Sequence, residues 1–243
     1  MSKTNHKQNQ FKRICLTCVT LLTLQVGIAN AEVLDSLTVH GSLFSEPLHL
    51  GLSESHGHPG VALSLDLELG NHFYIGANGY RATDSRPPNR SENYNLYIGT
   101  HWGKQDKTQF DIALIHRSYP GDFPINWDYT ELQFDTHFTE NFALSLTGSI
   151  DYYGLDEANS LGITGSYVHD FSDNLFAKIE GGTLRLDGKN LDSYEFAILG
   201  GGYRFDRLSF EILYRTNNAE ENRAFKRPQI RDGFIANLNW LIY

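Results

Sequence analysis

Acidic side chains at every second position are the first feature of this sequence with chemical meaning. In "GVALSLDLEL" (60–69), Asp66 and Glu68 fall on one face of an extended chain, and Leu65 and Leu67 fall on the other. Two carboxylates on one strand face form either a candidate catalytic pair or part of a polar wall. The polar wall is the more economical interpretation, because the same alternation recurs along most of the chain.

Two other sets of side chains could carry chemistry. His116 and Ser118 stand two residues apart, so a strand would place both on one face, where a base could activate a nucleophile. The asparagine that would complete such a set does not stand beside the serine. His56 and His58 share one segment, but two ligands without a third and a fourth make a weak metal site. We therefore predict no catalytic residue, no metal site and no cofactor.

The segments that must position these residues have the pattern of β-strands. About ten residues of apolar and polar alternation are followed by a turn, and no segment shows a sustained period of 3.6 residues. The sequence therefore predicts an all-β protein. Its expected strands lie at about 36–53, 60–69, 72–82, 93–103, 108–118, 127–138, 142–153, 160–170, 174–185, 193–205, 207–216 and 231–243. The first contains Pro47, so we expect a bulge or kink near Ser45 and Glu46.

The connections between these twelve segments alternate in length. Every second connection is tight: Gly70–Asn71, Lys104–Lys107, Thr139–Asn141, Phe171–Asp173 and Asp206. The others are longer and more polar, at 54–59, 83–92, 120–126, 154–159, 186–191 and 217–230. This asymmetry is typical of bacterial outer-membrane barrels. We therefore predict an antiparallel transmembrane β-barrel of about 12 strands, with short periplasmic turns, longer extracellular loops and both chain ends on the periplasmic side.

Aromatic residues gather at the ends of the predicted strands. Those beside the short turns are Phe73, Trp102, Phe110, Phe138, Phe142, Phe171, Phe176 and Phe205. Those toward the long loops are Tyr80, Tyr119, Trp127, Tyr152, Tyr153 and Tyr214. Membrane barrels carry such girdles at their two interfaces with the headgroups. We expect both sets of rings to face lipid.

The first 31 residues differ in composition from the rest of the chain. A basic start is followed by an apolar stretch from about Ile14 to Ile28, and an Ala29–Ala31 segment then precedes Glu32. This order is typical of a secretory signal peptide, with cleavage between Ala31 and Glu32. The apolar stretch is shorter than the roughly 20 residues that a membrane helix needs. The sequence thus predicts a signal peptide at 1–31 and an outer-membrane barrel domain at 32–243.

The charge balance narrows the class of partner. The chain carries 20 Lys and Arg and 29 Asp and Glu, and four of the basic residues lie in the predicted signal peptide. The mature part therefore has 16 basic and 29 acidic groups, a net charge of −13. Such a balance argues against nucleic acid and against an acidic membrane surface as partner. Cys15 and Cys18 both lie in the signal peptide, so no disulfide supports the exported fold.

If the apolar strand faces meet lipid, the polar faces line a lumen. The predicted pore-lining residues are Asp66, Glu68, His101, Asp111, Arg117, Glu131, Gln133, Asp135, Asp151, Lys178, Glu180, Glu195, Glu211 and Arg215. Nine of these are acidic and three are basic, which predicts a weak preference for cations in a conducting pore. The alternative is that neighbouring charges pair and close the barrel, as Lys178 with Glu180 or Glu211 with Arg215 could.

Three segments show a resemblance to a known family. They are "HFYIGANG" (72–79), "NYNLYIGTHWG" (93–103) and "RSYPGDFPINWDYTELQFD" (117–135). They resemble the TorF-type porins, which share a Tyr-Pro-Gly element before a W/L-D-Y-T-E strand. Here the element stands at Tyr119–Gly121 and the strand begins at Trp127–Glu131. The resemblance implies an outer-membrane channel, and it supplies no catalytic or binding residue.

These patterns together favour a porin-like channel of the bacterial outer membrane, for passive diffusion of small polar solutes, and not an enzyme. The expected partners are outer-membrane lipid, the machinery that assembles barrels into that membrane, and small solutes or ions. The alternative is a closed barrel with a phospholipase-like, lipid-modifying role at Ser118, or with an interaction role at the outer surface. Single-channel conductance with ion selectivity would separate the two.

Overall fold

The computed structural model describes residues 34–83, 92–103, 108–120, 126–155, 157–189, 191–219 and 232–243. The predicted signal peptide at 1–31 and its cleavage site at Ala31 and Glu32 lie outside these residues, so both stay predictions. Most of the long connection at 217–230 lies outside them as well.

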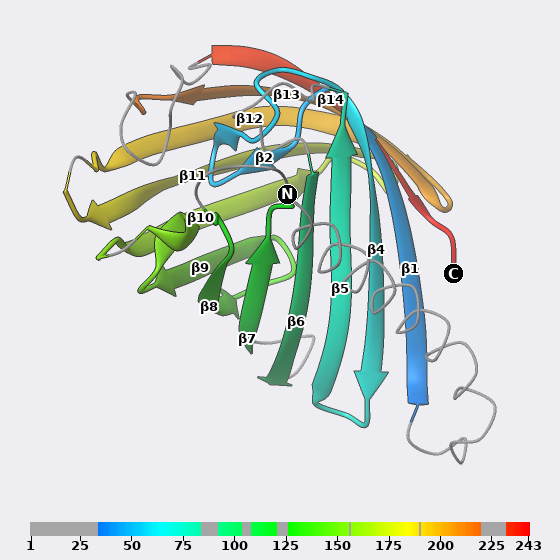
Figure 1. Cartoon of the computed structure of the whole chain (residues 1–243). Helices are drawn as coiled ribbons and strands as arrows, with labels where there is room; N and C mark the ends of the chain where they lie inside the picture. The colour runs from blue at the N-terminus through cyan, green and yellow to red at the C-terminus, as the bar shows by residue number, and fades with distance from the viewer. Residues whose placement is uncertain are drawn as a thin grey trace, which may run out of the picture.

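Alternating apolar and polar residues form long antiparallel strands that close into one barrel (Figure 1). Its twelve strands are β1 (Leu34–Phe44), β4 (Gly60–Leu69), β5 (Phe73–Ala82), β6 (Glu92–Gly103), β7 (Gln109–Ser118), β8 (Tyr129–His137), β9 (Phe142–Ser149), β10 (Asn159–Asp170), β11 (Leu175–Asp187), β12 (Tyr194–Phe205), β13 (Leu208–Asn217) and β14 (Asp232–Leu241). Each pairs with its neighbour in the chain, and β1 pairs with β14 to complete the ring. The predicted fold class and strand number are confirmed.

Two further pieces lie outside the barrel wall. β2 (Leu48–His49) and β3 (Leu52–Ser53) pair with each other as a separate hairpin. A single 3-10 turn, η1 (Tyr152–Gly154), follows β9. Within the described ranges, no helix has the length and apolar character needed to cross a membrane.

Apolar side chains cover the outside of the barrel. Along β4 the exposed residues Leu63 and Leu65 alternate with Ser64 and Asp66, which are half-buried on the inner face. The same alternation runs around the ring, and Leu96 on β6 is 64% exposed. A closed barrel satisfies all its backbone groups within the wall, so an apolar outer surface of this kind is suited to lipid. The predicted direction of the leucines is therefore confirmed.

Where the structure describes the connections, their lengths alternate as expected, and the predicted short turn Lys104–Lys107 lies outside the described residues. The chain between Leu69 and Phe73 forms a short turn at one end of the barrel, visible below β4 and β5 in Figure 1. The turns at 138–141, 171–174 and 206–207 are also short, whereas the connection at 45–59 is long. Short turns on outer-membrane barrels face the periplasm. We accordingly name the short-turn end of the barrel the inner end and the long-loop end the outer end.

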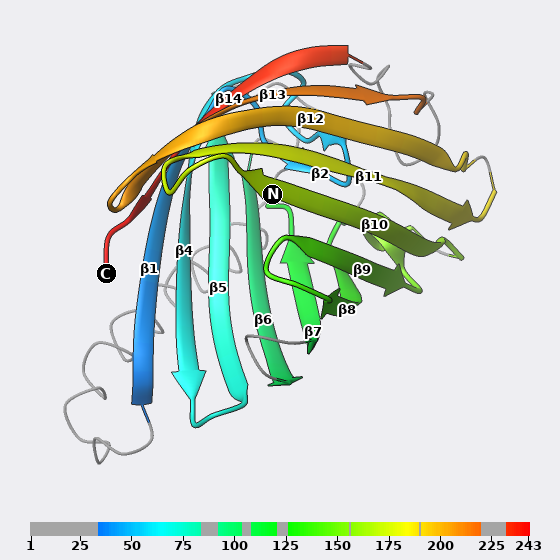
Figure 2. The same ribbon diagram turned by 180° about the vertical axis from the view of Figure 1, so that it is seen from behind.

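The structure differs from the prediction at the first strand. β1 ends at Phe44 instead of continuing to residue 53, and the chain then enters the barrel (Figures 1 and 2). We call residues 45–59 the inward loop, and its β2–β3 hairpin lies inside the ring in both views. Pro47 has no N–H for a strand ladder, and buried Glu46 and Leu52 find partners in the interior. The chain therefore bends at Ser45 and Glu46, as expected, but it leaves the wall there and does not resume the strand.

The predicted outer aromatic girdle is wrong for most of its members. Tyr214 faces outward and is 40% exposed. In contrast, Tyr80 lies on the inner face of β5, where it meets the Phe44 ring at 5.9 Å between centroids. The remaining four are buried inside the barrel: Tyr119, Trp127, Tyr152 and Tyr153. Period-2 alternation cannot show this, because β9 ends at Ser149 and the last two tyrosines follow a turn.

The predicted inner girdle is confirmed with one exception. The residues that face outward and are exposed there are Phe73, Trp102, Phe138, Phe142, Phe171 and Phe205. Phe110 stacks on Trp102, with 5.7 Å between ring centroids. Phe176 is the exception, because it is 5% exposed and faces the lumen, where the Arg204 guanidinium lies 4.2 Å from its ring centroid. The register of β11 places it on the inner face with Lys178 and Glu180.

Candidate functional site

The outer half of the lumen is filled by a packed group of mostly aromatic and aliphatic side chains. We call it the outer cluster, and its buried members are Leu52, Tyr119, Trp127, Tyr129, Tyr152, Tyr153, Leu155, Ala158, Leu184, Leu186, Tyr194, Phe196, Ile198, Leu213, Ala219 and Ile235. Leu52 comes from the inward loop, Tyr152 and Tyr153 from η1, and Tyr129 from β8. The Tyr129 and Tyr153 rings meet edge to face, with centroids 5.1 Å apart. The cluster thus holds the inward loop against the wall.

A buried ion pair fixes the start of the inward loop. Arg215 on β13 donates from Nη2 to both carboxylate oxygens of Glu46, at 2.9 and 3.0 Å. Arg215 is 0% exposed and Glu46 is 6% exposed. A buried charge that loses its partner costs several kcal/mol, so each residue here requires the other. Arg215 therefore anchors the inward loop and does not line an open lumen.

A second charged group holds the hairpin. Arg117 Nη2 on β7 donates to Glu131 Oε1 on β8 at 2.9 Å, and Glu131 is 1% exposed. The imidazole of His49, at the hairpin, lies with Nε2 3.8 Å from Glu131 Oε2 and 3.3 Å from the Tyr129 hydroxyl. Glu131 is thus shared between the wall and the inward loop.

Hydrogen bonds to Gly51 and Glu54 hold the second half of the inward loop. Tyr119 donates from its hydroxyl to Glu54 Oε1 at 2.8 Å, and Asn217 Nδ2 donates to the Gly51 carbonyl at 3.1 Å. Burial, followed by the nearby Glu54 carboxylate, raises the pKa of Tyr119 well above its ordinary value of 10. The phenol therefore keeps its proton and can donate it to Glu54.

The tip of the hairpin needs an unusual backbone. Leu50 and Gly51 both have positive φ, 47° and 74°, as in the two-residue turns that suit the twist of a hairpin. At Gly51 a Cβ would lie 2.4 Å from Cβ of Phe196, so no larger residue fits against the outer cluster. The left-handed conformation costs Leu50 of the order of 1 kcal/mol. Its side chain then reaches the lumen below the loop.

The inner half of the lumen carries carboxylates with a different set of partners. Asp66, Asp111 and Asp135, which we call the inner carboxylates, lie on the inner faces of β4, β7 and β8. Asp111 and Asp135 stand directly opposite each other on neighbouring strands. Among the described residues, none of the three forms an ion pair with Lys or Arg. The inner lumen is therefore net negative at this level.

Neutral donors surround these carboxylates instead. Tyr97 donates to Asp66, and Tyr74 donates to Asp111 Oδ1 at 2.8 Å. The Tyr97 ring lies across Gly76, where a Cβ would come within 2.3 Å of it, and this close approach brings the hydroxyl to Asp66. Hydrogen bonds of this kind orient a carboxylate without cancelling its charge.

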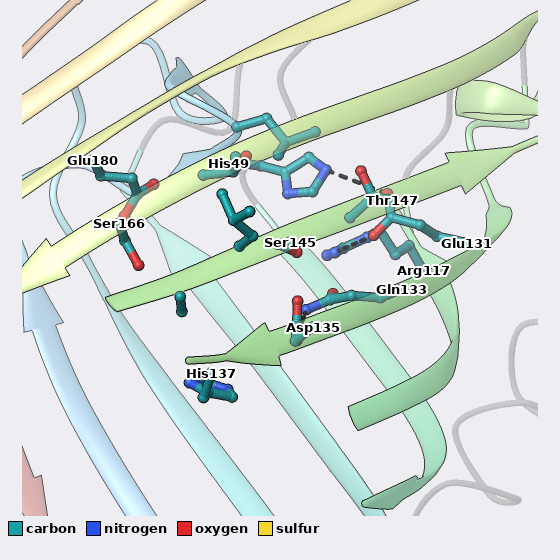
Figure 3. Close-up of a pocket in the computed structure, with 14 residues that line it drawn as sticks. His49, Arg117, Glu131, Gln133, Asp135, His137, Ser145, Thr147, Ser166 and Glu180 are labelled. Carbon is teal, nitrogen blue, oxygen red and sulfur yellow. Dashed lines mark hydrogen bonds and ion pairs between the residues drawn. The ribbon is translucent and has the colours of Figure 1, made fainter. Parts of the chain in front are cut away.

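A cavity of about 300 Å³ lies beneath the inward loop, along the wall formed by β8–β11 (Figure 3). Its lining residues are His49, Leu50, Arg117, Glu131, Gln133, Asp135, His137, Ala143, Leu144, Ser145, Thr147, Thr164, Ser166 and Glu180. Gln133 Nε2 donates to Asp135 Oδ2 at 2.7 Å on its wall. Carboxylates, hydroxyls, an amide and imidazoles thus face one space, as in a site for a small polar solute.

Most of the residues predicted to line the pore do face the lumen. They are Asp66, Glu68, His101, Asp111, Arg117, Glu131, Gln133, Asp135, Lys178, Glu180, Glu211 and Arg215, whose strands place them on the inner face. Five of them meet at the cavity: Arg117, Glu131, Gln133, Asp135 and Glu180. Their part in a conducting pore stays a prediction.

Two of the predicted lumen residues lie elsewhere. Glu195 is exposed on the outer face of β12, because its buried neighbours Tyr194 and Phe196 take the inner face. Asp151 lies beyond the end of β9, where its Oδ1 accepts from Ser149 Oγ at 2.8 Å and from the Thr130 N–H at 3.3 Å. Asp151 therefore caps strand ends and does not form part of the wall.

Of the two charge pairs that the sequence suggested, one forms and the other does not. Lys178 Nζ lies 2.9 Å from Glu180 Oε2, which confirms the first pair. The second is wrong, because Arg215 binds Glu46 and Glu211 accepts a hydrogen bond from Asn237 at 3.4 Å. Sequence analysis missed Glu46 because a charged residue in an expected strand gives no sign that the strand has ended.

The two residues considered for enzyme chemistry, His116 and Ser118, each bind a different partner. His116 Nδ1 lies 3.2 Å from Thr130 Oγ1, and Ser118 Oγ donates to Asp128 Oδ1 at 3.2 Å. In the part of the chain that the structure describes, no hydrogen bond links His116 to Ser118. Within that part, no three His, Cys, Asp or Glu residues group closely enough to hold a metal ion.

Comparison with known proteins identifies the architecture. A scan against models of protein families finds no match, and neither does a search of the curated proteins. Among solved structures, the KdgM porin matches with a TM-score of 0.52 and 8% identity over 85% of this chain and 99% of that chain. A membrane protein from a study of in-meso crystallization matches with a TM-score of 0.54 and 13% identity over 84% and 82%.

A third structure, an outer-membrane channel from Pseudomonas putida F1, has a TM-score of 0.48 and 12% identity over 88% of this chain and 98% of that chain. The similarities with TM-scores of 0.52 and 0.54 concern the fold and not the solute, and the resemblance to the TorF-type porins stays an interpretation. A closed ring of twelve antiparallel strands, an apolar outer surface and a polar inner face are the features of outer-membrane barrels. The chain is accordingly a β-barrel of the bacterial outer membrane.

Proposed function

We propose that this barrel is a porin-like channel that lets small polar solutes and cations diffuse passively across the outer membrane. The observation that carries the proposal is the inner half of the lumen, where carboxylates without cationic partners and a cavity of about 300 Å³ face one space. Insertion by the outer-membrane assembly machinery belongs to the same proposal, since closed barrels of this kind need it to enter the membrane.

The inner carboxylates give the proposed channel its weak preference for cations. A negative charge attracts a cation with about 1 kcal/mol at 4 Å in water, and with more where protein walls lower the local dielectric constant. Among the described residues, Asp66, Asp111 and Asp135 form no ion pair with Lys or Arg. The Arg117–Glu131 and Arg215–Glu46 pairs are internally neutral and contribute little to selectivity.

The inward loop sets the width of the proposed path. Its hairpin and the outer cluster occupy the outer half of the lumen, so they limit the space that remains for a solute. In other outer-membrane barrels, loops or a helix fill part of the interior in a similar way. Removal of the hairpin should therefore widen the path and leave the barrel wall intact.

Planar-bilayer conductance of the refolded protein tests the proposal. We expect discrete channels in the wild type and several-fold larger ones when residues 48–53 are replaced by two glycines. Folding is checked independently, since a folded barrel resists SDS until boiled and then changes its gel mobility. If the wild type folds and does not conduct, the proposal is wrong.

The outer cluster itself favours a second candidate, a closed barrel that acts at the outer surface. Its buried rings fill the lumen as a structural core would. This candidate predicts no conductance in the wild type and channels only after the hairpin is removed. A lipid-modifying version further predicts that Ser118→Ala abolishes phospholipid turnover by the refolded protein, whereas the channel proposal predicts no turnover to lose.

A further inference from the structure

We infer that the cavity beneath the inward loop is a binding site for a small hydroxylated ammonium compound, a cation with one primary ammonium group and several hydroxyls. The inference rests on the proposed function, because it names the class of solute that the lumen would hold. It follows from the charges, the unused hydrogen-bonding atoms and the size of the cavity.

The charge of the cavity selects a cation. Arg117 neutralises Glu131 at 2.9 Å, and Lys178 neutralises Glu180 at 2.9 Å. Asp135 remains: it accepts a hydrogen bond from the neutral Gln133 amide at 2.7 Å, and Asp111 stands opposite it on the neighbouring strand. One net negative charge thus faces the cavity, and a solute with one positive charge would balance it.

Two of the residues that line the cavity each carry a buried polar atom without a hydrogen-bond partner among the described residues. Asp135 Oδ1 is an acceptor that can take a proton from an ammonium group. Arg117 Nε is a donor that can serve a hydroxyl oxygen. Buried polar atoms without partners are costly, so a solute that satisfies both atoms is favoured over one that satisfies neither.

The rest of the lining suits hydroxyl groups. Ser145 and Thr147 on β9 and Thr164 and Ser166 on β10 present side-chain hydroxyls from adjacent strands (Figure 3). The described residues that line the space include no Phe, Tyr or Trp, so they offer no flat platform for a sugar ring. A volume of about 300 Å³ lies at the lower limit of small-molecule sites. A compact polyhydroxylated solute therefore fits better than a ring or a chain.

Three probes of nearly equal size test the charge. Tris(hydroxymethyl)aminomethane, protonated at pH 7, is compared with the uncharged pentaerythritol and with the anion 2,2-bis(hydroxymethyl)propionate by calorimetric titration of the refolded barrel in phosphate buffer. We expect the ammonium compound to bind about fivefold more tightly than the neutral polyol, the factor that about 1 kcal/mol gives, and the anion to bind most weakly. Equal binding of all three would overturn the inference.

Two variants locate the site. Asp135→Asn should make the ammonium compound and the neutral polyol bind equally. Asp173→Asn makes the same chemical change in an exposed short turn at the inner end, and should keep the fivefold preference. A preference that survives Asp135→Asn, or no binding of the ammonium compound to a folded barrel, contradicts the inference.

The titration separates this inference from the proposed function, because binding is measured without transport. A barrel that conducts ions in bilayers but shows no Asp135-dependent binding retains the channel proposal and loses the solute. A barrel that binds the ammonium compound as expected but conducts no ions, even without residues 48–53, loses the channel proposal instead.

Discussion

The outer and inner halves of the lumen use the same types of charged residue in opposite ways. In the outer half, Glu46 and Glu131 are 6% and 1% exposed, and each meets an arginine at 2.9 Å. In the inner half, Asp111 and Asp135 face each other across neighbouring strands and accept hydrogen bonds from a tyrosine and a glutamine. The two outer ion pairs are neutral and packed, whereas the inner carboxylates have no Lys or Arg partner among the described residues and lie beside a hollow space.

This difference separates a structural from an electrostatic role. Breaking a buried ion pair leaves an uncompensated charge, so the Glu46–Arg215 and Glu131–Arg117 pairs serve to hold the inward loop in place. A carboxylate beside a cavity can stay solvated, so its charge remains available to attract cations. Loss of an outer charge should therefore change stability first, and loss of an inner charge should change selectivity first.

The largest effect is expected from Arg215→Ala. The change leaves Glu46 buried without its partner, which should lower the free energy of unfolding by about 3–5 kcal/mol and release the inward loop. Urea unfolding and single-channel conductance measure the two consequences. Arg207→Ala, in an exposed short turn, is the matched control and should alter neither quantity. A stable Arg215→Ala barrel of unchanged conductance would break the distinction between the halves.

A smaller loss of stability is expected from Glu131→Gln. The glutamine keeps the shape and one hydrogen bond but leaves Arg117 without a counter-charge, at a cost of about 3 kcal/mol. Urea unfolding of the single variant and of Arg117→Gln with Glu131→Gln tests this. The double variant should recover part of the stability, because the uncompensated charge is gone. No recovery would show that the pair does not act as a unit.

Alkaline pH should weaken the outer half through Tyr119. Its pKa is raised in the folded state, so above about pH 10 the unfolded chain releases this proton and the folded chain does not. The contribution to stability is complete below pH 10 and falls by about 1.4 kcal/mol per pH unit above it. Tyr119→Phe removes the titrating hydroxyl and with it this contribution to the pH dependence. The loss of unfolding free energy from pH 9 to pH 11 should therefore be smaller in Tyr119→Phe than in wild type.

The smallest effect in energy is expected in the inner half. Asp111→Asn with Asp135→Asn removes two uncompensated charges and should move the reversal potential in a salt gradient toward anions, by an energy of about 1 kcal/mol. Stability should change little. The neutral replacement of Arg117 and Glu131 by glutamine should leave the reversal potential unchanged. If it shifts selectivity as much as the aspartate variant does, the two halves are not electrically distinct.

Much of the barrel could be predicted from local patterns. The alternation of Leu65 and Asp66 predicts which face of β4 points outward and which points inward. The turn after Leu69 is short because its residues only reverse the direction of the chain. The prediction from alternation is wrong for residues whose side chains do not follow the pattern of the barrel wall. Tyr152 and Tyr153 continue the pattern of β9 in the sequence, yet a turn with positive φ at Tyr153 carries both into the outer cluster. Glu195 shifted to the outer face because the neighbouring Tyr194 and Phe196 pack inside.

The sequence by itself determined the strands, their outer and inner faces and the unequal ends of the barrel, because alternation and turn length are properties of neighbouring residues. Only the tertiary structure decided which charges are paired and which remain free. Glu46 and Arg215 lie 169 positions apart, and no local pattern relates them. Their meeting depends on the closed ring, which brings the inward loop from β1 against β13 and leaves Asp135 alone beside the cavity.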